Sequence, residues 1–290
     1  MAQYRIITDS CCDLSVDLIK ELDIDVIPLS LLLDDHTYLN YPDWREISPK
    51  DFYGALRGKK TASTSAINME MFVEAFEEYL KNGMDILYLA FSSALSATFN
   101  ASKLAAGELL EKYPDRKIIC CDTLSASMGQ GLLVYYVAKN CKDKTIEEAF
   151  EYAESIKQNV VHWFTVDDLG FLHRGGRISS VTAVVGSLLS VKPILHVSEE
   201  GKLVSVSKVR GRKSSIKQLF ENTASGAINL KDQVVFISHG DCEDEALELA
   251  RLLKEKGVKD VIVNYIGPVI GAHSGPGTLA VFCFAENRNV

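Results

Sequence analysis

Hydroxyl side chains that follow predicted strands are the first candidates for chemistry in this sequence. The segment 85–90 is apolar apart from Asp85 and Tyr88, is short enough for a buried strand, and is followed closely by Ser92 and Ser93. A helical pattern comes next, so both hydroxyls would lie where a strand of a parallel sheet turns into a helix. Ligands bind at that edge of an open sheet, and the free N–H groups of the helix favour an anion there.

Other hydroxyls occupy comparable positions, at or just after the ends of predicted strands or in loops. Because strand ends of a parallel sheet meet at one edge, these groups together would offer neutral hydrogen-bond donors to one oxygen-rich ligand group. The alternative is that such residues only cap the helices that follow them, and the sequence leaves both interpretations open. The residues are Thr8, Ser10, Thr61, Ser63 and Thr123.

His273 is the second candidate. It stands between Gly271 and Gly275 in the glycine- and proline-rich segment 267–278, which we expect to be a loop. Such a backbone would leave the imidazole free to project into a site and to hydrogen-bond a carboxylate. The alternative is a histidine that is simply exposed to water.

Paired arginines form the third group. Arg174 and Arg177 flank a glycine turn, and Arg210 and Arg212 stand at the start of a basic helix predicted over 210–221, in a chain whose formal net charge is −8. Arginine binds phosphate and carboxylate through two parallel hydrogen bonds, which indicates a docking face or a phosphate contact. Solvated charged loops are the alternative.

Composition and missing motifs exclude several functions. A net charge of −8 argues against nucleic acid as the main partner, and no apolar run is long enough to span a membrane, so at most a transient membrane contact is expected. The sequence lacks a nucleotide-binding glycine loop, a Gly-x-Ser-x-Gly nucleophile elbow and metal-ligand spacing, so we expect no cofactor and no metal. The start of the chain does not resemble a signal peptide, which favours a cytoplasmic location.

The seven cysteines fit a reducing compartment. Cys11–Cys12 and Cys120–Cys121 are adjacent pairs, which make poor disulfides, and the count is odd. We expect reduced cysteines that are mostly structural. A thiol sensor built on Cys11 and Cys12 is the competing hypothesis.

Alternating strand and helix patterns predict an α/β protein. With 290 residues, two domains are expected, an N-terminal parallel sheet with helices on both faces over residues 1–160 and a C-terminal α/β domain over residues 161–290. Further expected elements are a single strand over 25–33, a hydroxyl-rich loop over 59–65, a helix over 181–189, a hairpin from 193–197 and 202–209, and a strand over 279–284.

Six of these motifs, in this order, resemble the DegV family of bacterial fatty acid-binding proteins. The resemblance runs from residue 4 to about residue 285. Two positions differ from the pattern common in the family, with Ala97 in place of Gly and Thr64 in place of Pro. The motifs are Ile7-Thr-Asp-Ser10 with Asp13-Leu-Ser15, Lys60-Thr61, Ser92-Ser-Ala-Leu-Ser-Ala-Thr98, Asp122-Thr123, Leu172-His-Arg-Gly-Gly-Arg-Ile-Ser179 and Gly267-Pro-Val-Ile-Gly-Ala-His-Ser-Gly-Pro-Gly277.

The resemblance implies a carrier, not an enzyme. A long-chain fatty acid would be buried between the two domains, its carboxylate presented to a separate fatty acid kinase, and the acyl phosphate then carried. Thr61, Ser93 and His273 would hold the carboxylate, and the regions of Arg174, Arg177 and Arg210 would face the kinase or the phosphate. The competing hypothesis is a hydrolase-like or kinase-like α/β enzyme that uses Ser92 or Ser93 with His273.

Overall fold

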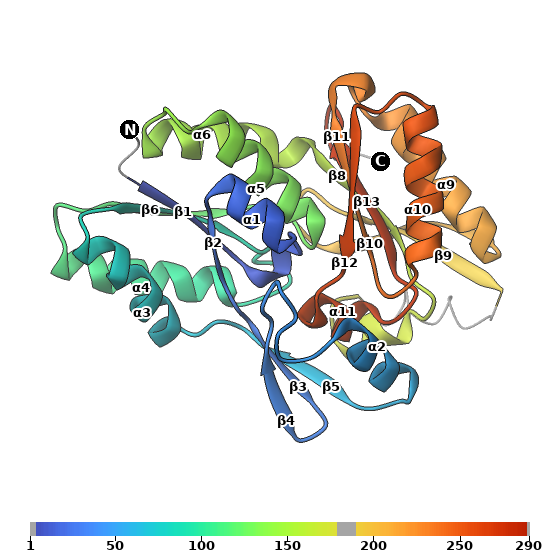
Figure 1. Ribbon diagram of the computed structural model, residues 1–290, viewed down its shortest axis with the longest axis horizontal. Helices are drawn as coiled ribbons and strands as arrows, with labels where there is room; N and C mark the ends of the chain where they lie inside the picture. The colour runs from blue at the N-terminus through green and yellow to red at the C-terminus, as the bar shows by residue number, and fades with distance from the viewer. Residues whose placement is uncertain (1–3, 179–189, 289–290) are drawn as a thin grey trace.

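The computed structural model describes residues 4–178 and 190–288, and the helix predicted over 181–189 lies outside them. The chain forms a mixed α/β fold with a parallel sheet on one side and a larger, mostly antiparallel sheet on the other (Figure 1). A third, small sheet projects below them. The expected fold class is therefore confirmed.

The N-terminal sheet is parallel and has the strand order β2-β1-β6-β7. Residues alternate between its two faces, because Leu87 and Leu89 pack into one apolar cluster and Ile86 and Tyr88 into another. Helices cover both faces, as predicted. The strands are β1 (Tyr4–Asp9), β2 (Asp25–Ile27), β6 (Asp85–Ala90) and β7 (Ile118–Asp122), and the helices are α1 (Val16–Leu22), α3 (Met69–Lys81), α4 (Thr98–Lys112), α5 (Met128–Asn140) and α6 (Ile146–Ile156).

The prediction of one strand over 25–33 is wrong. Pro28 lacks a backbone N–H, and the chain leaves the parallel sheet there before it forms an antiparallel hairpin whose turn holds Asp34 at φ 52°. The segment 59–65 is likewise not only a loop, since its second half is a strand of the same small sheet. That sheet has the order β4-β3-β5 and lies beside α2 (Pro49–Arg57); its strands are β3 (Ser30–Leu33), β4 (His36–Leu39) and β5 (Ala62–Ser65).

The C-terminal sheet has the order β10-β9-β8-β13-β11-β12 and includes the predicted β9–β10 hairpin and the predicted last strand. Helices α9 (Arg212–Gly226) and α10 (Glu243–Glu255) lie together on one side of it (Figure 1). Leu132 and Val134 of α5 pack in one apolar cluster with residues of both large sheets, so α5 lies between the sheets. The strands are β8 (Val160–Thr165), β9 (Val191–Val197), β10 (Leu203–Arg210), β11 (Val234–His239), β12 (Asp260–Tyr265) and β13 (Leu279–Phe284).

The glycine-rich segment 267–278 is mainly a helix, which corrects the expectation of a loop. Helix α11 (Pro268–Ser274) begins with a proline at its first position and ends before Gly275, whose φ is +80°. Proline fits a first helical position and glycine fits the left-handed residue after a helix, so the same residue types that indicate a loop also delimit a short helix. His273 is therefore held on a helix.

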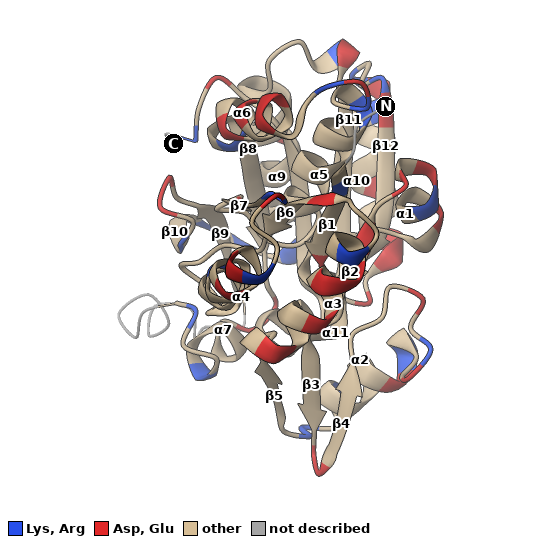
Figure 2. Ribbon diagram, turned by 90° about the vertical axis from the view of Figure 1, so that its left-hand side faces the viewer, with Lys and Arg blue, Asp and Glu red and all other residues tan. Residues whose placement is uncertain are grey.

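Charged residues occur mostly in the outer helices and loops, while the strands between them contain few (Figure 2). Four short connecting elements complete the described part of the fold: α7 (Gly170–Arg174) and the 3-10 turns η1 (Ser10–Cys12), η2 (Lys157–Asn159) and η3 (Leu230–Asp232). In residues 4–178 and 190–288, no helix is long and apolar enough to cross a membrane.

Candidate functional site

An internal cavity of about 240 Å³ lies between the two large sheets and the small sheet. Its wall is predominantly apolar and draws on β8 and β13 of the C-terminal sheet, on α11, and on the segments that follow β6 and β7. An apolar wall with few polar groups is typical of a small-molecule site. The apolar lining includes Leu29, Phe91, Leu95, Phe164, Leu172, Val197, Leu203, Ile266, Val269, Ile270, Ala280 and Phe282.

Thr64 and His273 form the polar end of this cavity. The Thr64 Oγ1 atom lies 2.7 Å from His273 Nε2, at hydrogen-bond distance, and both residues line the cavity. Thr64 comes from β5, and His273 comes from the last turn of α11. Gly175 allows this packing, because a Cβ atom there would lie 2.2 Å from His273 Nδ1. A hydroxyl and an imidazole are thus fixed side by side in a predominantly apolar cavity.

His273 is a neutral imidazole near pH 7. Burial, and then the nearby positive charge of Arg177, lower its pKa to about 4. Arg177 lines the same part of the cavity, is half-buried, and donates a hydrogen bond from Nε to the carbonyl oxygen of Leu95 at 3.2 Å. The polar end therefore combines a cation, a neutral imidazole and a hydroxyl, a set of groups that suits the binding of one carboxylate.

Of the other predicted arginines, Arg174 and Arg210 lie on the surface. Arg174 is exposed, and its guanidinium stacks on the Phe171 ring at 4.7 Å from the ring centre. Arg210 is exposed at the end of β10, whereas Arg212 is half-buried and pairs with Glu245. The structure thus separates Arg177, which lines the cavity, from Arg174 and Arg210, which are exposed.

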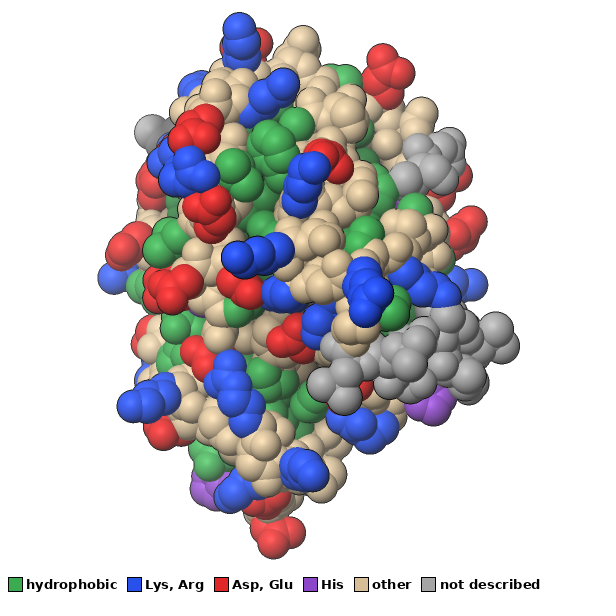
Figure 3. Space-filling view, turned by 90° about the vertical axis from the view of Figure 1, so that its right-hand side faces the viewer, with side chains coloured by type: hydrophobic (Ala, Val, Ile, Leu, Met, Phe, Trp, Pro, Cys, Tyr) green, Lys and Arg blue, Asp and Glu red, His purple; other side chains and the backbone are tan. Residues whose placement is uncertain are grey.

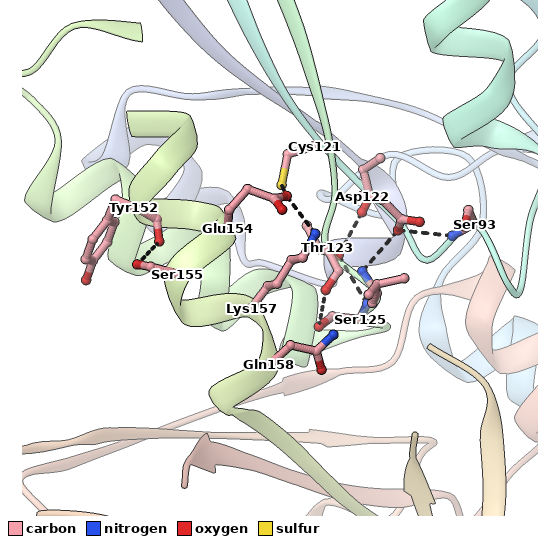
Figure 4. Close-up of polar contacts among 12 residues, drawn as sticks. Ser93, Cys121, Asp122, Thr123, Ser125, Tyr152, Glu154, Ser155, Lys157 and Gln158 are labelled. Atoms are coloured by element: carbon pink, nitrogen blue, oxygen red, sulfur yellow. Dashed lines mark hydrogen bonds and ion pairs between the residues drawn. The ribbon is translucent and has the colours of Figure 1, made fainter. Parts of the chain in front are cut away.

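The two serines after β6 do not line the cavity in the described part of the chain. Ser92 is buried, and its hydroxyl donates to the carbonyl oxygen of Gly201 at 2.9 Å. Ser93 is half-buried, and its backbone N–H donates to Asp122 Oδ1 at 3.2 Å (Figure 4). These contacts connect loops to one another. The role of Ser92 and Ser93 as direct ligands stays a prediction without geometric support.

The remaining predicted hydroxyls divide into exposed and structural groups. Thr61 and Ser63 are exposed, whereas Thr64 on the same strand faces inward, because alternate residues of a strand face opposite sides. The hydroxyl of Thr8 donates to the carbonyl oxygen of Leu89 at 2.7 Å, and that of Ser10 accepts from the N–H of Leu29 at 3.0 Å. A similar bond from Thr123 reaches the carbonyl oxygen of Ala90 at 2.7 Å.

Several lining residues escaped the sequence interpretation. Thr64 could have been found by continuing the alternation of β5, and both positions that depart from the family pattern, Thr64 and Ala97, line the cavity. His162 appears in the sequence only as a polar residue within an apolar strand, with no local signal for a site. The further polar lining residues are Ser96, Ser127, Ser274 and Thr278.

Asp13 connects the wall of the cavity to both halves of the molecule. Its carboxylate accepts from the Ser127 hydroxyl at 2.5 Å and from the Gly267 N–H at 2.9 Å, directly before α11. The Ser127 hydroxyl, which lines the cavity, is also 2.9 Å from that of Ser238. Burial raises the pKa of Asp13 to about 7, against the lowering effect of these hydrogen bonds and with a further increase from Asp9.

The fold and the cavity define a two-domain α/β protein with a predominantly apolar cavity between its sheets. A model of the DegV family, described as uncharacterised proteins, matches residues 3–286. The chain therefore belongs to the DegV family.

Sequence relatives cover almost the whole chain. A DegV domain-containing protein of Clostridium perfringens is 49% identical over 290 residues, which are 99% of this chain and 99% of that protein. A DegV domain-containing protein of Streptococcus pyogenes is 37% identical over 286 residues, which are 98% of this chain and 99% of that protein. The family assignment thus extends over both large sheets and the cavity between them.

Solved structures resemble the whole fold. A DegV lipid-binding protein from Thermotoga maritima has a TM-score of 0.86 at 29% identity and full coverage of both chains. A DegV family protein from Thermus thermophilus, described for its fatty acid binding, has a TM-score of 0.86 at 29% identity, with 97% and 99% coverage of the two chains. DegV from Bacillus subtilis, a fatty acid-binding protein, has a TM-score of 0.83 at 28% identity, with 98% and 100% coverage.

Proposed function

We propose that this protein binds a long-chain fatty acid in the apolar cavity and holds its carboxylate at the polar end near Thr64 and His273. The observation that carries the proposal is a predominantly apolar cavity in which the side chains of Thr64, Arg177 and His273 lie together as a head-group site. Burying one methylene contributes about 0.8 kcal/mol, so a tail of about 16 carbons offers roughly 12 kcal/mol before ordering costs. The tail supplies affinity, and the head group needs only enough hydrogen bonds to offset its desolvation.

The bound lipid tests this proposal directly. Protein purified without added lipid is extracted with organic solvent, and the extract is analysed by mass spectrometry alongside native mass spectrometry of the intact protein. We expect one fatty acid per chain. Protein that is reproducibly empty, and that binds no fatty acid after delipidation and titration, would refute it.

The proposed task is to present the carboxylate to a separate fatty acid kinase and to carry the resulting acyl phosphate. The segment from Lys202 to Lys217 supports a docking role, because it holds six cations and no carboxylate in a chain of net charge −8. Lys208, Arg210 and Lys213 are exposed there. Figure 3, which views the right-hand side of Figure 1, shows many Lys and Arg side chains across this face. An acidic surface of the kinase would be attracted to such a segment.

A charge reversal separates docking from lipid binding. With a fatty acid kinase and ATP, we expect Arg210→Glu to slow acyl phosphate formation strongly while fatty acid binding is unchanged. The matched control is Lys142→Glu, which makes the same charge change at an exposed residue between α5 and α6. Equal rates for the two variants would contradict docking through the 202–217 segment.

The enzyme alternative has one observation in its favour, the 2.7 Å pair of Thr64 and His273, which resembles a nucleophile next to a base. Against it, no carboxylate in the described part of the chain hydrogen-bonds to the other imidazole nitrogen, and the serines after β6 make other contacts. Turnover of an ester or of ATP by the protein alone, lost in Thr64→Val, would support the enzyme. The thiol-sensor alternative is weakened because burial raises the pKa of Cys11 and Cys12, which disfavours the thiolate.

A further inference from the structure

The cavity extends along β8 and β13 of the C-terminal sheet. Leu279 of β13 pairs with Thr165 of β8 close to α7 and α11, which places the Thr64–His273 pair at that end. The β8 and β13 lining residues farthest from that end are the paired His162 and Phe282, roughly 10 Å along the strands at about 3.3 Å per residue. An acyl tail that starts beside His273 would therefore extend along β8 and β13 toward the beginning of β8.

A tight turn of residues 198–202, between β9 and β10, lies at that far end. Val197 directly before it and Leu203 directly after it both line the cavity. Inside the turn, the Ser198 N–H donates to the Lys202 carbonyl at 2.8 Å and the Gly201 N–H to the Ser198 carbonyl at 2.9 Å. The turn is thus a closed unit whose two flanking side chains reach the chamber.

Three side chains from other elements hold the 198–202 turn in place. The Ser92 hydroxyl donates to the Gly201 carbonyl at 2.9 Å, Gln158 Nε2 donates to the Glu199 carbonyl at 3.0 Å, and Arg288 Nη1 donates to the Ser198 carbonyl at 3.4 Å. Gln158 lies next to Ser125 and the segment that leaves β7 (Figure 4). The turn is therefore fastened to the N-terminal sheet, to η2 and to the C-terminal end of the described chain.

Gly201 leaves no room for a side chain at this contact. A Cβ atom there would lie 2.2 Å from Ser92 Oγ and 3.2 Å from Leu124 Cα, and Gly201 has φ +75°, which favours glycine. The backbone of the turn consequently packs directly against the Ser92 side chain and against Leu124 in the N-terminal loops. A side chain at position 201 would therefore displace the Ser92 hydroxyl, the turn, or both, and would break the hydrogen bond that joins them.

We propose that the 198–202 turn, held by the hydroxyl of Ser92 on Gly201, is the end wall of the acyl tunnel and sets the longest fatty acid that the protein accepts. This inference rests on the proposed function, because it assigns the tail end of the same cavity. Ser92 is then a specificity-determining residue that acts through the position of the turn, and it does not touch the head group.

The test compares binding of saturated fatty acids of increasing length to delipidated protein. Affinity of the wild type should rise about fourfold with each added methylene until the tail meets the end wall, and then stop rising. In Ser92→Ala and Gly201→Ala, the chain length at which affinity stops rising should increase. Fatty acids longer than the wild-type limit should then gain affinity about fourfold for each newly accommodated methylene. In Leu203→Phe, which adds bulk beside the turn, the chain length at which affinity stops rising should decrease.

Two controls make the result specific. Ser102→Ala removes an equally buried serine hydroxyl, which donates to the Phe99 carbonyl at 2.7 Å on α4, outside the described lining of the cavity. It should leave the length profile unchanged. His273→Ala should lower affinity for all lengths by one common factor. Thermal melting of each variant verifies that the protein is folded.

The outcomes separate this inference from the proposed function. A wild type that binds no fatty acid of any length refutes both. A wild type that binds, with Ser92→Ala, Gly201→Ala and Leu203→Phe all keeping its length limit, refutes only the end wall. Shifts in opposite directions for Gly201→Ala and Leu203→Phe would establish it even if Ser92→Ala failed to fold.

Discussion

The two ends of the cavity use similar side chains in opposite ways. At the polar end, Thr64 and His273 contact each other and line the cavity. At the far end, the hydroxyl of Ser92 and the amide of Gln158 donate to backbone carbonyls of the 198–202 turn. Hydroxyl groups near a ligand chamber therefore do not all serve the ligand. A polar side chain that already donates its hydrogen bond to a backbone carbonyl stabilises the fold and has no donor left for a ligand.

Arg288 is the strongest case of a polar group used for structure. It is 2% exposed, and its guanidinium donates to the carbonyl oxygens of Val160 and Lys157 at 2.8 and 2.7 Å and to the Ser125 hydroxyl at 2.7 Å. Burial lowers its pKa to about 10. The residue joins the segment after β7, the η2 turn and the start of β8, and its Nη1 also donates to the Ser198 carbonyl of the 198–202 turn at 3.4 Å.

The largest effect is expected from Arg288→Met. Several buried carbonyl groups lose their donor at once, so the free energy of unfolding should fall by about 3 kcal/mol or more. Urea unfolding measures the change, with Arg251→Met as the control, because Arg251 is half-exposed and its pairs with Glu248 and Glu255 contribute little. Similar losses for both variants would mean that the far end is not the more tightly structured region.

His273→Ala should produce the converse result, a large loss of binding with little loss of stability. A hydrogen bond to a charged group contributes about 1.5–3 kcal/mol, so fatty acid affinity should weaken about 10- to 150-fold. Titration of delipidated protein, with thermal melting in parallel, measures both. A large drop in melting temperature with unchanged affinity would assign His273 to the structure and remove the contrast between the ends.

The sequence predicted the parallel sheet because a buried strand, a turn and an amphipathic helix are local patterns that repeat. It did not predict which hydroxyls face the cavity. Ser92 and Thr64 are both small polar residues beside apolar runs, and only the three-dimensional packing pairs the first with Gly201 and the second with His273. Their partners lie 109 and 209 residues away, so no local pattern distinguishes them.

Likewise, the sequence could not show that segment 267–278 is a helix. Its glycines and prolines indicate a loop by residue type, whereas in the structure Pro268 starts α11 and Gly275 ends it. Short helices owe most of their stability to packing, which a single sequence does not reveal. The prediction of His273 as a site residue was possible because its flanking residues are small, and in the structure His273 lines the cavity.

Asp13→Asn tests the connection that Asp13 makes between the two halves of the molecule, through Ser127 and Gly267. Asp13 has a pKa raised from 3.8 to about 7, so the folded protein binds a proton that the unfolded chain releases, and stability falls as pH rises between about 4 and 7. The slope from this one group is at most about 1.4 kcal/mol per pH unit. The Asn variant lacks this titrating group. Its free energy of unfolding, measured with urea at several pH values, should therefore change less with pH than that of the wild type.

Asp9 keeps part of the pH dependence in that variant, because burial raises its pKa as well. The sign of the remaining slope should therefore be unchanged. Asp9→Asn is the matched comparison, since Asp9 accepts from Tyr88 and Phe91 within the N-terminal half and does not bond to the segment before α11. A profile of Asp13→Asn identical to that of the wild type would contradict a buried, proton-binding Asp13.

The smallest effect is expected from Thr64→Val, which removes the hydroxyl and keeps the shape. A neutral hydrogen bond contributes about 0.5–1.5 kcal/mol, so fatty acid affinity should weaken about 2- to 12-fold. Because the Thr64 hydroxyl lies 2.7 Å from His273 Nε2, part of this loss should come from a less firmly oriented imidazole. The loss should then shrink in a His273→Ala background, and a double-mutant cycle measures the difference. Equal losses in both backgrounds would mean that the two residues contact the carboxylate independently.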